Sequence, residues 1–309
     1  MLGNSSSAAN YRGRFAPSPT GPLHFGSLIA AVASYLQAVV QKGEWLVRIE
    51  DIDPTREIPG TADSILRSLD AHGFNYPRPL YQSTRLETYA AIIDELLANG
   101  SAYRCSCTRK KIRATAKSGS TGPIYPGTCR SGADTRARPA TSIRVRTTDD
   151  ILTFTDALQG ELCCRPESEI GDYLIRRGDG LVAYQLAVVV DDQAQQITEV
   201  ARGTDLLDPT FMQIGLQRLL GYPQPAYMHF PVATGPNGKK LSKQTGASKI
   251  NDKHASNNLF QALNFLRQRP EKDLETAPLK DLWAWAAENW DPLVLQSIRN
   301  QPDGSIMTQ

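Results

Sequence analysis

The chain has 309 residues, 40% of them hydrophobic and 21% charged, which is ordinary for a globular protein of one large or two modest domains. Its net charge of +2 excludes a general attraction to nucleic acid, so an RNA surface would need local clusters of basic residues. No segment reaches the roughly 20 apolar residues of a membrane span, and the first ten residues lack the pattern of a signal peptide. The five cysteines do not suggest a disulfide framework. We therefore expect a cytoplasmic monomer with no membrane partner.

Strands and helices alternate through the first hundred residues. A strand at residues 14–16 precedes a helix at 27–41, in which Leu28, Val32, Leu36 and Val39 recur at helical spacing. A second strand at 45–50 is followed by helices at 61–72 and 85–99. This order predicts an α/β fold with a doubly wound parallel sheet, whose first half occupies residues 11–100.

Four further segments follow. Residues 101–145 lose the apolar periodicity and gain cysteines, bases, glycines and prolines, which indicates an insertion. Residues 146–200 resume the sheet domain, and we expect residues 172–192 to be rich in strands. Residues 201–250 form a connecting region in which Asp208 and Pro209 favour a helix start, and residues 251–309 form a polar helical tail.

Two motifs suggest a phosphate site. "PSPTGPLHFGS" places His24 and Gly26 between a strand and the start of a helix, where unpaired N–H groups and the helix dipole favour anions. "KKLSKQ" places Lys240 and Lys243 in a glycine-rich loop at 235–246, where two ammonium groups can neutralise a triphosphate. Taken singly, the first motif is also compatible with a tight turn and the second with a solvated surface. Together they favour a nucleotide.

Both motifs resemble the two signature sequences of class I aminoacyl-tRNA synthetases, and "RFAPSPTG", "VRIEDID" and "VVVDD" are similar to glutamyl-tRNA synthetases. Only about sixty-five residues follow the lysine loop, so the chain resembles the shorter glutamyl-queuosine tRNA(Asp) synthetase family. The resemblance implies a Rossmann-like class I core. It also implies activation of L-glutamate by ATP with Mg²⁺, and transfer of glutamate to the queuosine base in the anticodon of tRNA(Asp). A shortened glutamyl-tRNA synthetase that charges a tRNA 3′ end is the alternative.

The resemblance also implies roles for individual residues. His24 and Lys243 would be catalytic and, with Gly26 and Lys240, would bind ATP. The L-glutamate site would comprise Arg14, Phe15, Ala16, Pro17, Ser18, Glu50, Tyr184 and Arg202. Two positions depart from the wider family: Ser27 stands where a second histidine is common, and Val188 stands where an asparagine is usual, which puts glutamate affinity in doubt.

The insertion carries three clustered cysteines, Cys105, Cys107 and Cys129, which suit a closed metal site in a segment too small to hold itself together. Buried free cysteines are the alternative. The resemblance implies one structural zinc ion with Tyr125 as its fourth ligand. The basic residues at positions 109, 110, 111, 113 and 117 favour an RNA contact slightly over the alternative of a solvated loop.

Two other functional classes compete with this interpretation. Asp51, Asp53 and Thr55 follow a predicted strand and resemble the nucleophile loop of haloacid-dehalogenase-like phosphatases, with "VVVDD" as a source of metal-binding carboxylates. A non-catalytic RNA-binding paralogue is the other possibility. It would have no need to retain His24, Lys243, Arg14 and Arg202 together.

Overall fold

The computed structural model describes residues 11–119, 121–133, 141–235 and 249–302. Its central feature is a twisted sheet made of two sets of strands, which meet where β1 lies beside β11. The strands that pair in parallel are β1 (Arg12–Phe15), β2 (Glu44–Ile49), β3 (Leu80–Tyr81), β8 (Leu152–Asp156), β11 (Glu199–Gly203) and β12 (Ala226–Phe230). One set has the order β1-β2-β3 and the other the order β11-β12-β8-β9, where β9 (Gly160–Cys164) is antiparallel to β8. The amide of Thr198, just before β11, donates to the carbonyl of Arg12, 2.9 Å away, and so joins the two sets.

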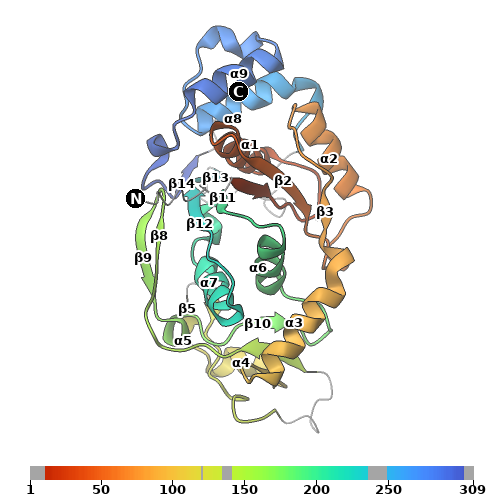
Figure 1. Ribbon diagram of the computed structural model, residues 1–309, viewed down its shortest axis with the longest axis vertical. Helices are drawn as coiled ribbons and strands as arrows, with labels where there is room; N and C mark the ends of the chain where they lie inside the picture. The colour runs from red at the N-terminus through yellow and green to blue at the C-terminus, as the bar shows by residue number, and fades with distance from the viewer. Residues whose placement is uncertain (1–10, 120, 134–140, 236–248, 303–309) are drawn as a thin grey trace, which may run out of the picture.

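Helices cover both faces of this sheet (Figure 1). They are α1 (Phe25–Val40), α2 (Thr61–Ala71), α3 (Leu86–Ala98), α6 (Tyr184–Ala194) and α7 (Pro209–Leu220). Side chains alternate along β2: Trp45 and Val47 pack in the apolar cluster that contains α1, and Leu46 packs against the cluster that contains α6 and α7. This alternation confirms the predicted doubly wound α/β core.

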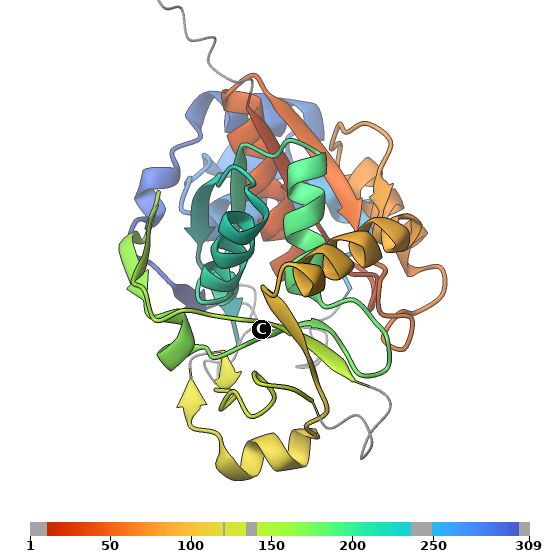
Figure 2. The same cartoon turned by 60° about the horizontal axis from the view of Figure 1, so that its bottom comes forward.

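The predicted insertion forms a separate layer at the end of the molecule away from α1. Its elements are β4 (Ala102–Cys105), α4 (Arg109–Thr115), β5 (Ser118–Gly119), β6 (Gly122–Pro123) and β7 (Ser142–Val145). β7 is the middle strand of an antiparallel sheet with β4 and β10 (Leu174–Arg176), so a strand from outside residues 101–145 belongs to this layer. Figure 2 shows the layer in front of the main sheet, with the short helix α5 (Pro166–Glu169) on the chain that returns from β9 to the layer at β10.

Two local expectations were wrong. Residues 184–194 form α6 and not the expected strand. The prediction failed because a short run such as Leu186–Val190, which is buried on all sides, has no periodicity that distinguishes a strand from a helix. α7 begins with Pro209 at its first position as predicted, but Asp208 has helical dihedral angles and makes no side-chain capping bond.

The C-terminal segment packs on the α1 face. It contains α8 (Ala255–Phe265) and α9 (Leu279–Asn289), and β14 (Asn300–Pro302), which pairs in parallel with β13 (Val232–Thr234). Trp283 of α9 contacts Tyr35 and Phe74 edge to face, at centroid distances of 5.0 and 5.2 Å, and its indole N–H donates to the carbonyl of His72. Among the described helices, none is long and apolar enough to cross a membrane.

Candidate active site and metal cluster

A cavity of about 420 Å³ opens where β1 and β11 end, on either side of the point where the strand order reverses. Ligands of open parallel sheets bind at the carboxyl ends of the strands beside such a reversal. The lining includes these residues proposed from sequence: Arg14, Phe15, Ala16, Pro17, Ser18, His24, Gly26, Tyr184 and Arg202. Residues that are up to 188 positions apart in the chain therefore share one cavity, whose volume suits a small-molecule ligand.

The N-terminus of α1 forms one wall of the cavity. His24 is the N-cap residue, and its Nδ1 accepts a hydrogen bond from the amide of Ser27 at 3.3 Å, so a neutral ring carries its proton on Nε2. The first turn of α1 contains no acidic residue that would oppose an anion. Ser27 itself lines the cavity. Lys240 and Lys243 lie outside the described residues.

Arg202, at the end of β11, is a buried cation that also lines the cavity. Its Nε donates to Nε2 of His229 at 3.0 Å, and its Nη2 donates to Oγ1 of Thr210 at 2.7 Å. Its Nη1 is buried and has no hydrogen-bond partner among the described residues. Tyr184 lines the same cavity, and burial together with the charge of Glu50 raises its pKa to about 12, so its hydroxyl is protonated at neutral pH.

Arg14, which lines the cavity, and Glu50 belong to one buried ionic network. Nε and Nη2 of Arg14 donate to the two carboxylate oxygens of Asp192, at 3.0 and 3.1 Å, and Nη1 of Arg48 donates to the same carboxylate at 2.8 Å. Glu50 lies 3.8 Å from Nη2 of Arg48, and its Oε1 has no hydrogen-bond partner. Burial raises the pKa of Glu50 to about 7, although Arg48 and Arg14 oppose this shift. Glu50 does not line the cavity. Its amide donates to the carbonyl of Pro17, and Pro17 does line the cavity.

Asp192 is a site residue that the sequence did not single out for this role. Its carboxylate holds Arg14 and Arg48 in place, and these arginines keep its pKa below the usual range despite the burial of the carboxyl group. The only local signal was the acidic pair that ends "VVVDD". Val188, in the same helix, is fully buried in the cluster that contains α6 and α7 and does not line the cavity.

The carboxylates of the alternative phosphatase motif have other partners. Asp51 accepts from the amide and hydroxyl of Ser83, and Asp53 accepts from Thr55 and pairs with Arg177 at 2.7 Å. Among the described residues, the three cysteines form the only group of His, Cys, Asp or Glu side chains arranged to hold a metal ion. The phosphatase interpretation therefore lacks its metal-binding carboxylates in the described part of the chain.

Cys105, Cys107 and Cys129 form that cluster, with their sulfur atoms buried and all within 4.8 Å of one another. The Tyr125 hydroxyl lies 3.4 Å from Sγ of Cys105 and 3.6 Å from Sγ of Cys107, and Cys107 and Cys129 are 3.6 Å apart. Burial alone would raise the pKa of Cys129, but hydrogen bonding, chiefly to Tyr125, lowers it to about 7. The four predicted ligands therefore converge in a group that can hold a metal ion.

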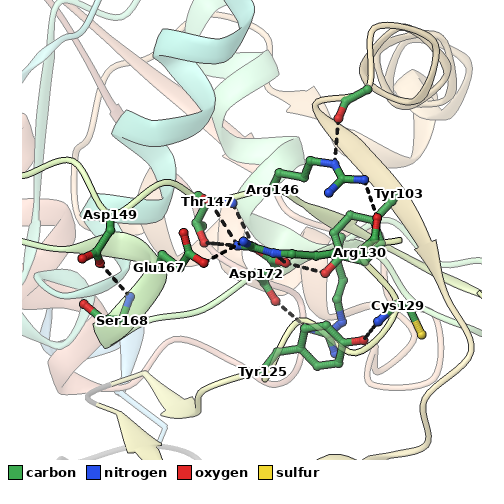
Figure 3. A network of polar contacts seen from close by, with 12 residues as sticks. Tyr103, Tyr125, Cys129, Arg130, Arg146, Thr147, Asp149, Glu167, Ser168 and Asp172 are labelled. Atoms are coloured by element: carbon green, nitrogen blue, oxygen red, sulfur yellow. Dashed lines mark hydrogen bonds and ion pairs between the residues drawn. The ribbon is translucent and has the colours of Figure 1, made fainter. Parts of the chain in front are cut away.

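A polar network fixes this cluster to the antiparallel sheet (Figure 3). Arg130, the residue after Cys129, donates two hydrogen bonds of 2.6 Å to the carboxylate of Asp172. The same carboxylate accepts from the hydroxyl of Tyr103 and from the amide and hydroxyl of Thr147. Tyr103 belongs to β4, Thr147 follows β7 and Asp172 precedes β10, so the loop that carries Cys129 is tied to all three strands of the sheet.

The basic residues of the insertion lie on an exposed surface. Arg109, Lys110, Lys111 and Arg113 belong to α4, which has no buried residue, and Lys117 follows it. None of the five takes part in an ion pair with another described residue. This surface is compatible with both an RNA contact and a solvated face.

Comparison with known proteins gives the family. The sequence profile for the catalytic domain of class I tRNA synthetases (E and Q) matches residues 10–270. A glutamyl-Q tRNA(Asp) synthetase from Dechloromonas aromatica is 52% identical over 293 residues, which is 93% of this chain and 97% of that protein. The chain belongs to the glutamyl-Q tRNA(Asp) synthetase family. Its relative of the same name from Chromobacterium violaceum is 49% identical, over 92% of this chain and 95% of that protein.

The fold of this family member is also that of larger synthetases. A glutamate tRNA ligase from Elizabethkingia meningosepticum, solved in complex with its amino acid, matches with a TM-score of 0.79 at 22% identity. The match covers 96% of this chain and 68% of that one. It supports the class I Rossmann-like fold predicted from the sequence.

Proposed function

We propose that this protein activates L-glutamate with ATP and transfers the glutamyl group to the queuosine base in the anticodon of tRNA(Asp). The observation that carries the proposal is the high identity to glutamyl-Q tRNA(Asp) synthetases over more than nine-tenths of the chain. The cavity at the ends of β1 and β11 supports it, because it combines a helix N-terminus suited to phosphate with a buried arginine suited to a carboxylate.

In the first step, the α-carboxylate of glutamate attacks the α-phosphate of ATP and pyrophosphate leaves. No covalent enzyme intermediate forms, so the protein must orient the two substrates and stabilise the developing charge. His24 and the α1 N-terminus, with Gly26, Lys240 and Lys243, would hold the phosphates, and Mg²⁺ would accompany ATP as part of the substrate.

Glutamate itself offers two carboxylates and one ammonium group. Arg202 would bind a carboxylate through Nη1, and Arg14 and Tyr184 would contribute further donors. Glu50 and Ser18 would accept from the ammonium group, and residues 15–17 would form the wall between them. The protonated hydroxyl of Tyr184 suits a donor role.

We further propose that the metal is zinc and that it is structural. A tetrahedral zinc ion holds sulfur and oxygen ligands about 3.5–3.8 Å apart. Two separations in the cluster, both 3.6 Å, fit this spacing, and a third, of 3.4 Å, lies just below it. Cys105, Cys107, Tyr125 and Cys129 would fill four coordination positions, which leaves none for a substrate and makes the ion a clamp for the insertion.

The test compares two acceptors on the same tRNA. Labelled glutamate, ATP and tRNA(Asp) with or without queuosine are incubated with the protein, after periodate oxidation of the tRNA 3′ terminus in one series. Label that requires queuosine and survives oxidation supports the proposal. Label that requires an intact 3′ diol refutes it in favour of 3′ charging. Glutamate-dependent ATP–pyrophosphate exchange, measured alone, reports the activation step separately.

A further inference from the structure

We propose that Asp156 and His229 are positioning residues for Arg202. They hold its guanidinium group in the orientation that keeps Nη1 available for a substrate carboxylate. This inference rests on the proposed function, because that function supplies the carboxylate. It concerns residues that do not line the cavity themselves.

Arg202 differs from the other buried arginines of the site in having no carboxylate partner. Arg14 and Arg48 both pair directly with Asp192, whereas no ion pair among the described residues includes Arg202. The groups in contact with its guanidinium group are neutral: the ring of His229, the hydroxyl of Thr210, the carbonyl of Leu206 at 3.4 Å, and the ring of Tyr227, whose centroid lies 5.6 Å from the guanidinium carbon. A buried cation without a counter-ion is costly. An anionic substrate group would remove that cost.

The hydrogen bonds of His229 require one neutral tautomer. Nε–H of Arg202 can only donate, so Nε2 of His229 must accept, and the ring proton must be on Nδ1. Nδ1 faces Oδ2 of Asp156 at 2.6 Å, and that carboxylate oxygen accepts the proton's hydrogen bond. Burial of the ring lowers the pKa of His229 to about 4, so the imidazole is neutral at physiological pH.

Asp156 is itself fixed in orientation. Its Oδ1 accepts from the amides of Leu158 and Gln159, both at 3.0 Å, and from the amide of His229 at 3.2 Å. These three donors bind one oxygen and leave the other for the imidazole. The carboxylate is therefore held by backbone, the imidazole by the carboxylate, and Arg202 by the imidazole.

This indirect arrangement has a chemical consequence for the cavity. A carboxylate bonded directly to Arg202 would neutralise its charge and compete with a substrate carboxylate for the same donors. A neutral imidazole satisfies Nε–H without placing a carboxylate in contact with the guanidinium group. Thr210 acts in the same sense, because its hydroxyl accepts from Nη2 and donates to the carbonyl of Leu206 at 2.8 Å.

The test is Asp156→Asn. In this variant the three amides hold the asparagine oxygen at the Oδ1 position, so its NH₂ group must face Nδ1 of His229. The proton of the His229 ring must then move to Nε2, where it opposes Nε–H of Arg202. We expect the KM for glutamate in ATP–pyrophosphate exchange to rise about tenfold or more, since a charged hydrogen bond is lost, with the KM for ATP changing less than about twofold. His229→Gln is the conservative variant, because its amide can donate to Asp156 and accept from Arg202. It should keep the KM for glutamate within about threefold of wild type.

Tyr227→Phe is the matched control on the same strand. It removes the buried hydrogen bond from Gln217 at 3.0 Å but keeps the ring beside Arg202, so the KM for glutamate should not change. If Asp156→Asn leaves that KM unchanged, or raises both KM values alike together with a loss of thermal stability, the positioning role is refuted.

A second readout does not depend on activity. The chain has four histidines, so ¹⁵N-detected NMR can resolve their ring nitrogens, with His229→Gln assigning the signal. Wild type should show the Nδ1–H tautomer and Asp156→Asn the Nε2–H tautomer. An Nε2–H tautomer in wild type overturns the inference. Wild-type protein with the Nδ1–H tautomer but without glutamate-dependent exchange would instead refute the proposed function.

Discussion

Glu50 is a buried carboxyl group whose ionisation should control glutamate binding near neutral pH. Its pKa is raised to about 7 by burial, and its Oε1 has no hydrogen-bond partner. If the substrate ammonium group binds only the carboxylate form, about one protein molecule in eleven is competent at pH 6 and about ten in eleven at pH 8. The KM for glutamate should therefore be about tenfold higher at pH 6 than at pH 8.

Glu50→Gln separates the charge from its titration. The amide cannot ionise, so the variant should lose a charge-assisted hydrogen bond of about 1.5–3 kcal/mol, which is a rise of about 12- to 160-fold in the KM at pH 8. The pH dependence between 6 and 8 should disappear at the same time. The assay is ATP–pyrophosphate exchange at saturating ATP, with glutamate varied at pH 6, 7 and 8.

Glu44→Gln provides the control, because Glu44 is an exposed residue at the start of β2, the strand that Glu50 follows, and forms a surface ion pair with Arg12. It removes an equal charge and should leave the KM and its pH dependence unchanged. A wild-type KM that stays flat from pH 6 to 8 would refute the argument from burial. A Glu50→Gln variant that keeps the wild-type pH dependence would show that another group titrates.

Three further predictions concern stability and the metal. The purified protein should contain about one zinc ion per chain by elemental analysis. The variant Cys129→Ala should lose this zinc and become sensitive to proteolysis within residues 101–145. A zinc content in Cys129→Ala equal to that of the wild type would exclude Cys129 as a ligand. Trp283→Phe loses the bond to the His72 carbonyl and should lower the Tm by about 2 °C, measured by calorimetry, and an unchanged Tm would contradict this. The pKa of His229 is lowered from 6.5 to about 4 on folding, so its contribution to stability is complete above pH 6.5 and is lost as the pH falls to 4. The loss should be about 3 kcal/mol in urea unfolding, and His229→Gln should show a correspondingly smaller loss.

The sequence predicted the strand and helix that carry the site better than the buried residues that hold its arginines in place. The strand before Pro17 and the helix after His24 lie within two residues of their expected bounds, because turn signals and apolar periodicity are local properties. Residues lining the cavity were found through quoted motifs. Their roles toward glutamate and ATP stay predictions.

The supporting residues were missed for a physical reason. Asp192 contacts Arg14 across 178 positions of sequence, and His229 contacts Asp156 across 73. Such pairs form only when the sheet brings distant strands and helices together, and no spacing rule within one segment indicates them. The helix α6 was missed for a different reason, because its short apolar run is buried on all sides and such a run occurs both in buried strands and in buried helices.

The pairing of β13 with β14 has a consequence for synthesis of the protein. Val232 and Ala233 of β13 line the cavity, and they pair with Asn300 and Gln301. A nascent chain emerges from its N-terminus. The parallel strands, the α1 N-terminus and Arg202 can therefore assemble while translation continues, but this wall gains its neighbouring strand only after residues 300–302 have left the ribosome. Completion of the cavity is thus coupled to the emergence of the C-terminal segment.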